Sequence, residues 1–287
     1  MKTYLDCIPC FIRQALEASK MATDDEAKRE KALKAVLSEL RKTSLKNKIP
    51  PQIARKVHRI VRKITKNDDP YKKVKDEYNK KALGMYPSLK RKVAKSKDRL
   101  LTATKLAIAG NIIDFGPSSK FDLERTIKDV LTQDFAINHF GYFRKMLSHS
   151  KKILYLGDNA GEIVFDRILL EVLKDKEITF VVKGGPIIND ATVEDAKSVG
   201  IDKIAKIEVI SNGDPGTGPA RRSKEFLKRL KDADLVISKG QGNYEALSDV
   251  DANIFFLLKV KCSLIARDIG AEVGDIVIKQ SRLQQKS

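Results

Sequence analysis

The second half of this 287-residue chain alternates short apolar runs with helical segments, and this alternation restricts the folds available to it. Between the runs the apolar spacing is helical, as from Ile163 to Leu173. Near-continuous apolar runs are typical of parallel strands that helices cover on both faces. The four runs are Lys152 to Leu156, Ile178 to Val182, Ile207 to Ile210 and Leu235 to Ile237. The sequence therefore predicts a three-layer α/β/α Rossmann-like domain.

Polar side chains and glycines follow these runs. Asp158 and Asn159 come after the first run, Asp190 after the second and Lys239 after the fourth. Because parallel strands end at one edge of a sheet, we expect the four side chains to converge at the edge where open α/β sheets bind ligands. The first pair also has a purely local interpretation, since Asp and Asn are among the best N-cap residues for the helix that follows.

The first part of the chain has a different character, with helical apolar spacing from about Phe11 to Ile108. Breaks are predicted at Pro50-Pro51, at residues 67–70 and near Tyr86-Pro87. We therefore expect an all-helical N-terminal region over residues 1–105 and the α/β/α domain over residues 106–287.

Composition narrows the class of protein. No apolar stretch reaches the length of a membrane span, and Met1 to Asp6 lacks the apolar core of a signal peptide. Three cysteines, an odd number in a large chain, argue against a secreted disulfide scaffold. We expect a soluble, cytoplasmic protein with no membrane partner. Abundant Lys, Arg and Glu without Trp is also typical of a thermophile.

The net charge of +18 raises nucleic acid as a partner, because basic residues concentrate between Lys28 and Lys66. An apolar stripe of isoleucines and valines from Ile53 to Ile64 instead indicates a helix with one packed face and a solvated basic face. The segment also lacks an aromatic stacking platform and any helix-turn-helix or zinc-finger pattern. Nucleic-acid or nucleotide binding is therefore kept only as an alternative.

Six short segments spread along nearly the whole chain form a recognisable series. They are Cys7-Ile8-Pro9-Cys10, Asp69-Pro70-Tyr71 with Asn79, residues 110–116, residues 157–162, residues 183–192 and residues 238–243. Each is a weak signal alone, but in this order they resemble the metal-dependent damage-control phosphatases, in the archaeal branch with a Cys-x-x-Cys motif. This family has also been described as acidic residue methyltransferase-like, and it was long catalogued as a domain of unknown function. Its members join a helical N-terminal region to a Rossmann-like domain.

The resemblance implies hydrolysis of phosphate monoesters of small metabolites, such as sugar phosphates or damaged nucleotide-related compounds. By position it assigns the ligands of a divalent metal to Asp158, Asn159 and Asp190. Oxygen ligands of this kind suit manganese first, with magnesium, nickel or cobalt as alternatives. A metal offsets charge on phosphoryl oxygens and activates water, which are the two needs of phosphate-ester hydrolysis.

The resemblance also assigns residues to the substrate. Lys239 matches the position expected to contact the phosphate, while Asn111, Asp114 and Asn243 match other positions of the pocket. Either Asp158 or Asp114 would orient or deprotonate the attacking water, and the sequence does not choose between them. Glu162 either supports the metal ligands or interacts with the dipole of its helix.

Other enzyme classes fit less well. A methyltransferase that uses S-adenosylmethionine remains an alternative, but its first turn is typically glycine-rich, whereas Asp158 and Asn159 stand at the centre of this one. A covalent phosphatase of the haloacid dehalogenase type would need a second Asp where this chain has Ala160. The run from Asn212 to Pro219 has neither a Walker ending nor dinucleotide-binding spacing.

Cys7 and Cys10 invite a zinc interpretation, but a structural zinc site needs four ligands and the chain has no second cysteine pair. A packing motif at a helix start, a redox-sensitive dithiol and a soft-metal site remain open for the pair. Cys262, the third cysteine, lies in apolar surroundings that favour burial. The resemblance implies that the pair approaches the active-site cavity, where oxidation would regulate activity.

Overall fold

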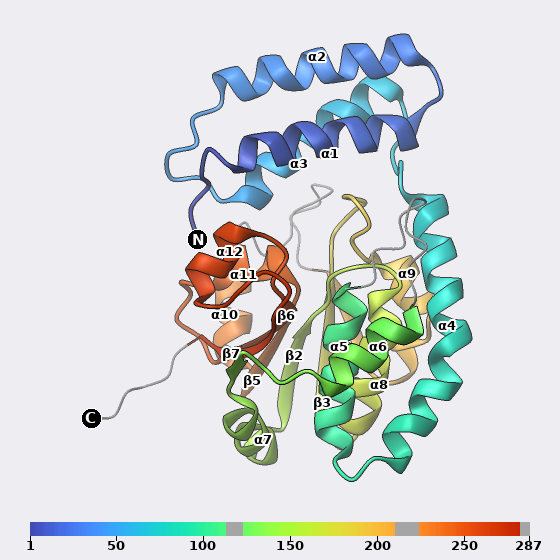
Figure 1. Cartoon of the computed structure of the whole chain (residues 1–287), viewed down its shortest axis with the longest axis vertical. Helices are drawn as coiled ribbons and strands as arrows, with labels where there is room; N and C mark the ends of the chain where they lie inside the picture. The colour runs from blue at the N-terminus through green and yellow to red at the C-terminus, as the bar shows by residue number, and fades with distance from the viewer. Residues whose placement is uncertain (113–122, 210–223, 282–287) are drawn as a thin grey trace.

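A computed structural model describes residues 1–112, 123–209 and 224–281 (Figure 1). Its centre is a seven-stranded sheet in the order β1-β7-β6-β5-β2-β3-β4. The strands are β1 (Ile137–Asn138), β2 (Lys152–Leu156), β3 (Glu177–Val182), β4 (Lys206–Val209), β5 (Leu235–Lys239), β6 (Ile254–Lys259) and β7 (Ile276–Gln280). All neighbours are parallel except β6 and β7, which pair antiparallel. The four apolar runs therefore predicted β2, β3, β4 and β5 correctly, while β6 and β7 were not among the predicted strands.

Helices cover both faces of this sheet, so the predicted three-layer α/β/α fold is confirmed (Figure 1). One face is covered by α4 (Lys72–Lys95), α5 (Arg99–Ile112), α6 (Leu123–Thr132), α7 (Phe140–His149), α8 (Glu162–Val172) and α9 (Val193–Ser198), the last followed by a short 3-10 helix (Ile201–Lys203). The other face is covered by α10 (Lys224–Asp232), α11 (Gln241–Leu247) and α12 (Ser263–Ile269).

Strand β2 shows why these strands read as continuous apolar runs. Ile153 and Tyr155 belong to the apolar core on one face of the sheet, while Leu154 and Leu156 belong to the core on the other. Alternate side chains point to opposite faces, so both sets must be apolar when both faces are covered. The ring of Tyr155 stacks on that of Phe180 in β3, with centroids 5.3 Å apart.

The order of the strands places a topological switch point beside β2. From β2 the chain moves outward through β3 and β4, and then returns to the other side of β2 for β5 and β6. Connections leave the sheet in opposite directions at such a point, and the crevice that opens at the strand ends is where α/β sheets bind ligands. The turn that follows Leu156 lies at this crevice.

The N-terminal helices α1 (Cys7–Ala22), α2 (Glu26–Lys42) and α3 (Pro50–Thr65) lie above the strand ends (Figure 1). They pack around their own apolar cluster, which Leu264 of α12 joins. Arg62 of α3 donates a hydrogen bond to the carbonyl oxygen of Pro186, 3.1 Å away, and so ties these helices to the loop after β3. The division at residues 105/106 stays a prediction; the apolar packing favours one near residue 70, because α4 and α5 belong to the core of the sheet.

Helix α4 corrects one expectation about this region. It runs without interruption from Lys72 to Lys95 and includes Pro87, where the sequence predicted a break. An internal proline costs about 3 kcal/mol. Burial of Ala82, Leu89 and Val93 against the core of the sheet offsets this cost. The two-residue strand β1, between α6 and α7, was also not anticipated, because it is too short to produce a pattern.

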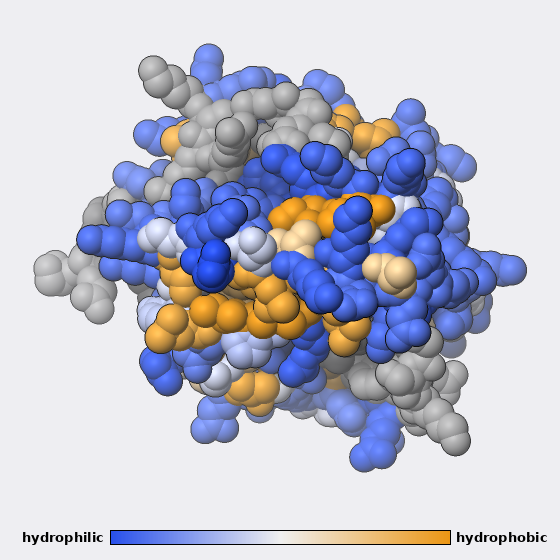
Figure 2. Space-filling model, turned by 90° about the horizontal axis from the view of Figure 1, so that it is seen from above, coloured by the Kyte–Doolittle hydropathy of each residue, from blue (hydrophilic) through white to orange (hydrophobic). Residues whose placement is uncertain are grey.

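The surface above α1, α2 and α3 mixes apolar and hydrophilic side chains (Figure 2). Apolar residues gather near the centre of this face with hydrophilic residues around them. Large exposed apolar side chains in this part of the chain include Tyr4, Leu5, Leu16 and Leu37. Across the described ranges, no helix is both long enough and apolar enough to cross a bilayer.

Candidate active site

The loops after β2 and β3 are pinned side by side at the switch point. The amide of Ala160 donates to the carbonyl oxygen of Asn189 at 2.8 Å, and the amide of Ala191 donates to that of Asp158, also at 2.8 Å. Between these bonds, Asn159 and Asp190 form an isolated antiparallel bridge. Short backbone hydrogen bonds thus bring Asp158 and Asn159, on the loop after β2, next to Asp190, on the loop after β3.

Asp158, Asn159 and Asp190 line one cavity of about 430 Å³. Its walls come from α1, α3, the loops after β2 and β3, α11 and the start of α12. Of the other residues named from the sequence, the lining includes Cys7, Cys10, Cys262 and Asn243. The helical region and the strand ends therefore enclose the cavity together.

The capping interpretation of Asp158 and Asn159 is wrong. Helix α8 has Gly161 as its N-cap, and no side chain caps it. The Nδ2 of Asn159 instead donates to Asp158 Oδ2 at 2.8 Å and to Glu162 Oε2 at 3.0 Å. Asn111 Nδ2 donates to the same two oxygens, at 3.3 Å and 3.0 Å. Because the amide nitrogen of Asn159 faces the carboxylates, its Oδ1 remains for another partner.

Lys239 lies beneath this layer and is fully buried. Its Nζ donates to Glu162 Oε1 at 2.7 Å, to Asp166 Oδ1 at 2.6 Å and to the carbonyl oxygen of Ala107 at 2.7 Å. An ammonium group has three protons, and these three bonds use all of them. The structure therefore places Lys239 as the partner of two carboxylates, and this geometry gives no support to the predicted phosphate contact.

The pKa values in this buried cluster reflect a balance of burial and charge. Burial disfavours the ammonium of Lys239, but Asp166 and Glu162 outweigh it and raise its pKa to about 12. Burial alone would raise the pKa of Glu162. The charge of Lys239 and the hydrogen bond from Asn111 outweigh burial, so the pKa of Glu162 is lowered. For Asp166 burial prevails over Lys239, and its pKa rises to about 6. The cluster thus holds Glu162 as a carboxylate directly under the cavity.

Lys183, unlike Lys239, lines the cavity, and so does Arg55 of α3. Lys183 follows β3 directly, is half-buried, and its Nζ donates to Asn243 Oδ1 at 3.0 Å. Asn243 in turn donates from Nδ2 to the carbonyl oxygens of Lys239, at 2.7 Å, and Gly157, at 3.2 Å. Asn243 therefore connects the ends of β2 and β5 to the Lys183 ammonium. The sequence carried a signal for Lys183, because it occupies a strand end just as Lys239 does.

Negative charge accumulates where the loops meet. Burial raises the pKa of Asp158 to about 7, and the carboxylates of Glu162 and Asp190 add to this while Lys183 and Lys261 oppose it. Burial also raises the pKa of Asp190, against the opposing charges of Lys183 and Lys75. The carboxylate of Asp190 has no hydrogen bond to any residue in the described part of the chain.

This donor set fits a divalent cation. Two carboxylates in a partly enclosed cavity repel one another, and hard oxygen donors are the ligands that Mn²⁺ and Mg²⁺ prefer. The amide oxygen of Asn159 supplies a third, uncharged donor. The set is sparse, since no three acidic, histidine or cysteine side chains converge on a point within residues 1–112, 123–209 and 224–281. Water and substrate oxygens would complete the coordination of a metal held there.

Gly240 allows the end of β5 to approach Asp158. Its φ of +78° lies in the region that favours glycine, and a Cβ on it would stand 1.9 Å from Asp158 Oδ2. Any side chain at this position would displace the Asp158 carboxylate.

Some sequence predictions fall elsewhere. Asp114 and the run from Asn212 to Pro219 lie outside the described residues. Cys7 is buried, Cys10 exposed and Cys262 half-buried rather than buried, yet all three line the cavity. Burial raises the pKa of the Cys7 thiol. A sequence alone cannot show that Cys262, more than 250 positions away, reaches the same wall.

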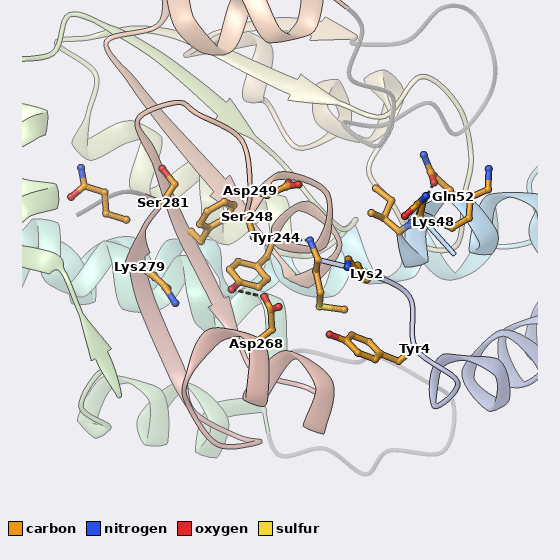
Figure 3. A pocket seen from close by; sticks show the side chains of 15 residues that line it. Lys2, Tyr4, Lys48, Gln52, Tyr244, Ser248, Asp249, Asp268, Lys279 and Ser281 are labelled. Atoms are coloured by element: carbon orange, nitrogen blue, oxygen red, sulfur yellow. Dashed lines mark hydrogen bonds between the residues drawn. The ribbon is translucent and has the colours of Figure 1, made fainter. Parts of the chain in front are cut away.

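A larger cavity, of about 950 Å³, opens elsewhere between the N-terminus, α11 and β7 (Figure 3). Its lining includes Lys2, Tyr244, Asp268 and Lys279, and Tyr244 Oη donates to Asp268 Oδ2 at 2.9 Å. The candidate ligands Asp158, Asn159 and Asp190 and the lysines Lys183 and Lys239 are absent from its described lining. Volume alone would select this larger cavity. We place the active site in the smaller one, because the candidate metal ligands line it.

A doubly wound sheet with two carboxylates, an amide and a lysine at its switch point defines a Rossmann-like domain with a polar ligand-binding crevice. Comparison with known proteins identifies the family. Residues 3–277 match the damage-control phosphatase ARMT1-like domain, so the chain belongs to this family.

The chain is similar to archaeal proteins over nearly its whole length. It is 36% identical to a damage-control phosphatase of Pyrococcus horikoshii, over 99% of this chain and 100% of that protein. A damage-control phosphatase of Archaeoglobus fulgidus is 37% identical, over 95% of this chain and 97% of the relative. The crystal structure of the DUF89 family protein of Pyrococcus horikoshii superposes with a TM-score of 0.85 at 34% identity, covering 98% of this chain and 100% of that one.

Proposed function

We propose that this protein is a metal-dependent phosphatase that hydrolyses phosphate monoesters of small metabolites, with a role in metabolite damage control. The observation that carries the proposal is the convergence of Asp158, Asn159, Asp190 and Lys183 in one cavity at the switch point. Family membership and the names of the relatives support the phosphatase activity.

Asp158, Asn159 and Asp190 would hold the divalent cation, with Mn²⁺ first and Mg²⁺, Ni²⁺ or Co²⁺ as alternatives. When bound, such a cation supplies an electrophile that offsets charge on the phosphoryl oxygens. The two carboxylates need this positive charge in turn, because burial and mutual repulsion raise the pKa of Asp158 to about 7.

Lys183 would contact the phosphoryl group. Its ammonium lies in the cavity, and Asn243 orients it through a 3.0 Å hydrogen bond. A positive charge placed where negative charge develops in the transition state contributes a large share of catalysis. We therefore move the phosphate-binding role, predicted for Lys239, to Lys183, while Lys239 holds Glu162 in place.

The attacking water requires a carboxylate to orient it or accept its proton. Asp158 is the first candidate, because its carboxyl group lines the cavity beside Asn159 and Asp190 and its pKa is close to neutrality. Asp114 remains the second candidate. A cavity of about 430 Å³ lies within the usual range for small-molecule sites and suits a small phosphorylated metabolite.

Hydrolysis of p-nitrophenyl phosphate and fructose phosphate with Mn²⁺, with and without chelator, tests the proposal. We expect Asp158→Ala to lose activity by on the order of a thousandfold, because both a ligand and the water-orienting group are removed. The matched control is Asp202→Ala, at an exposed position on the 3-10 helix, which should retain activity. Hydrolysis that survives chelation, or that Asp158→Ala retains, would contradict the proposal.

A further inference from the structure

Asn79 of α4 is a buried residue that bonds to the turn after β2 and to Asp195 of α9, the helix that follows the loop after β3. It is 4% exposed, and its Oδ1 accepts a hydrogen bond from the amide of Gly161 at 2.7 Å. Its Nδ2 donates to Asp195 Oδ1 at 3.0 Å. One amide side chain thus uses both of its ends, each on a different loop region.

The first of these contacts fixes the turn after β2. Gly161 follows Asp158 and Asn159 closely and is the N-cap of α8, with φ of +78°. The amide of an N-cap glycine has no partner inside the helix, and no side chain of the turn bonds to it. The Oδ1 of Asn79 therefore supplies an anchor for this turn from outside it.

The second contact fixes the loop after β3. Asp195 Oδ2 accepts from Thr192 N at 2.9 Å and from Thr192 Oγ1 at 2.7 Å, which closes the start of α9. Thr192 stands two positions after Asp190. Asn79, through Asp195, is thereby tied to the segment that delivers Asp190 to the cavity.

Lys75, one turn earlier on α4, pairs with Asp195 in a buried place. Its Nζ lies 3.2 Å from Asp195 Oδ2 and 2.8 Å from Asp69 Oδ2, and Lys75 is 1% exposed. A buried carboxylate without such a partner is strongly destabilising. The chain Asp69, Lys75, Asp195, Asn79 and Gly161 is therefore one connected polar network.

Docking of α4 onto the domain does not by itself explain this network. Apolar residues of α4, namely Ala82, Leu89 and Val93, already bury themselves in the core of the sheet. The polar contacts of Asn79 lie instead at the end of α4 that faces the two loops. Their effect is to set the distance between the turn that carries Asp158 and Asn159 and the segment that carries Asp190.

We propose that Asn79, held by Asp195 and Lys75, is a positioning residue for the cation site, which it serves by fixing the two ligand-bearing loops relative to one another. The inference rests on the proposed function, because it needs Asp158, Asn159 and Asp190 to bind a metal. Groups that orient metal ligands from behind typically change metal affinity by about 10-fold to 100-fold when removed.

The test is Mn²⁺ binding to the full chain by calorimetry, with kcat and KM for p-nitrophenyl phosphate and the apo-protein Tm measured alongside. We expect Asn79→Ala to raise the Kd for Mn²⁺ about tenfold and to leave KM at saturating Mn²⁺ nearly unchanged. Asn79→Gln keeps both polar ends on a longer side chain and should rescue part of the loss, to about threefold. Leu89→Ala is the structural control, which should lower the Tm without changing the Kd.

An Asn79→Ala protein that loses Tm but keeps the wild-type Kd would overturn the inference, because the network would then be only structural. Should this variant fail to fold, Asn79→Ser carries the test, because its side chain is too short to reach both Gly161 and Asp195, and an unchanged Kd in it has the same meaning. If Asp158→Ala abolishes Mn²⁺ binding while Asn79→Ala does not weaken it, the inference alone fails. If the wild type binds no divalent metal, both the inference and the proposed function fail.

Discussion

Two lysines stand at strand ends on either side of β2, Lys239 as the last residue of β5 and Lys183 directly after β3, and they differ in burial and in partners. Lys239 points beneath the sheet edge toward α5 and α8, is fully buried and bonds to three oxygens. Lys183 is half-buried in the cavity and bonds to Asn243. The comparison teaches that a strand end supplies a place for a charge, while the surrounding helices decide whether the charge supports the site or meets the ligand.

The largest expected effect is a loss of stability at Lys239, the buried member of the pair. Lys239→Met should lower the free energy of unfolding by about 3–5 kcal/mol, because Glu162 and Asp166 would remain buried without their cation. Urea unfolding at pH 7 measures this. Lys151→Met, at an exposed position, should change stability by less than about 0.5 kcal/mol. A small effect of Lys239→Met would show that its ion pairs are not what holds the cluster.

Lys183→Ala should lower activity strongly and stability only slightly, in contrast to Lys239→Met. We expect kcat/KM for p-nitrophenyl phosphate to fall about 100-fold, because a positive charge at the transferring group is lost. The free energy of unfolding should change by less than about 1 kcal/mol, since a single hydrogen bond to Asn243 is removed. Lys203→Ala, on the exposed 3-10 helix, is the control. If Lys183→Ala were as active as the wild type, the two lysines would not divide the roles in this way.

The affinity for Mn²⁺ should depend on pH because of Asp158, whose pKa is raised to about 7 in the metal-free protein. Below this pKa the carboxyl group is protonated, and a cation must displace the proton to bind. Affinity should therefore fall up to about tenfold for each pH unit below 7 and level off above it. Calorimetry between pH 5.5 and pH 8.5, in buffers of different ionisation enthalpy, measures both the affinity and the released proton. A flat profile would contradict the raised pKa.

In the metal-free protein, Asp158 in the cavity and Glu162 beside Lys239 change the free energy of unfolding in opposite directions as the pH rises. The raised pKa of Asp158 means that the folded state binds more protons than the unfolded chain, so this group's contribution to stability falls as pH rises toward 7. The lowered pKa of Glu162 means that its contribution is present above about pH 4.5 and is lost as pH falls. At neutral pH Glu162 and Lys239 thus stabilise the fold, whereas Asp158 and Asp166, whose pKa values are raised, oppose it.

The smallest effect is expected at Cys7. Cys7→Ser should keep metal-dependent turnover within about twofold, because a thiol and a hydroxyl are of similar size. It should alter how the activity responds to peroxide or to the identity of the metal, because Cys7 and Cys10 line the same cavity as Asp158. Activity assays before and after peroxide treatment, with Mn²⁺ and Ni²⁺, measure this. An unchanged response would make the cysteine pair structural.

Much of the site could be predicted because it follows from strand ends. The apolar runs showed where parallel strands stop, and parallel strands stop at one edge, so Asp158, Asn159 and Asp190 had to lie near one another. The helical region was equally visible, because its apolar spacing repeats over several turns. The predictions that were wrong concerned single residues: the residue that caps α8, the helix break at Pro87 and the direction of the Lys239 side chain.

The sequence by itself determined the parallel sheet and the gathering of acidic residues at its switch point, since burial on both faces demands continuous apolar strands and fixes where polar residues first occur. Only the tertiary structure decided which lysine faces the cavity, that Cys262 joins its wall, and that Asn79 ties two loops together. The physical reason is that each of these depends on contacts with α1, α4, α5 or α8. These elements lie far away along the chain, and their approach leaves no periodic pattern near the residues that they contact.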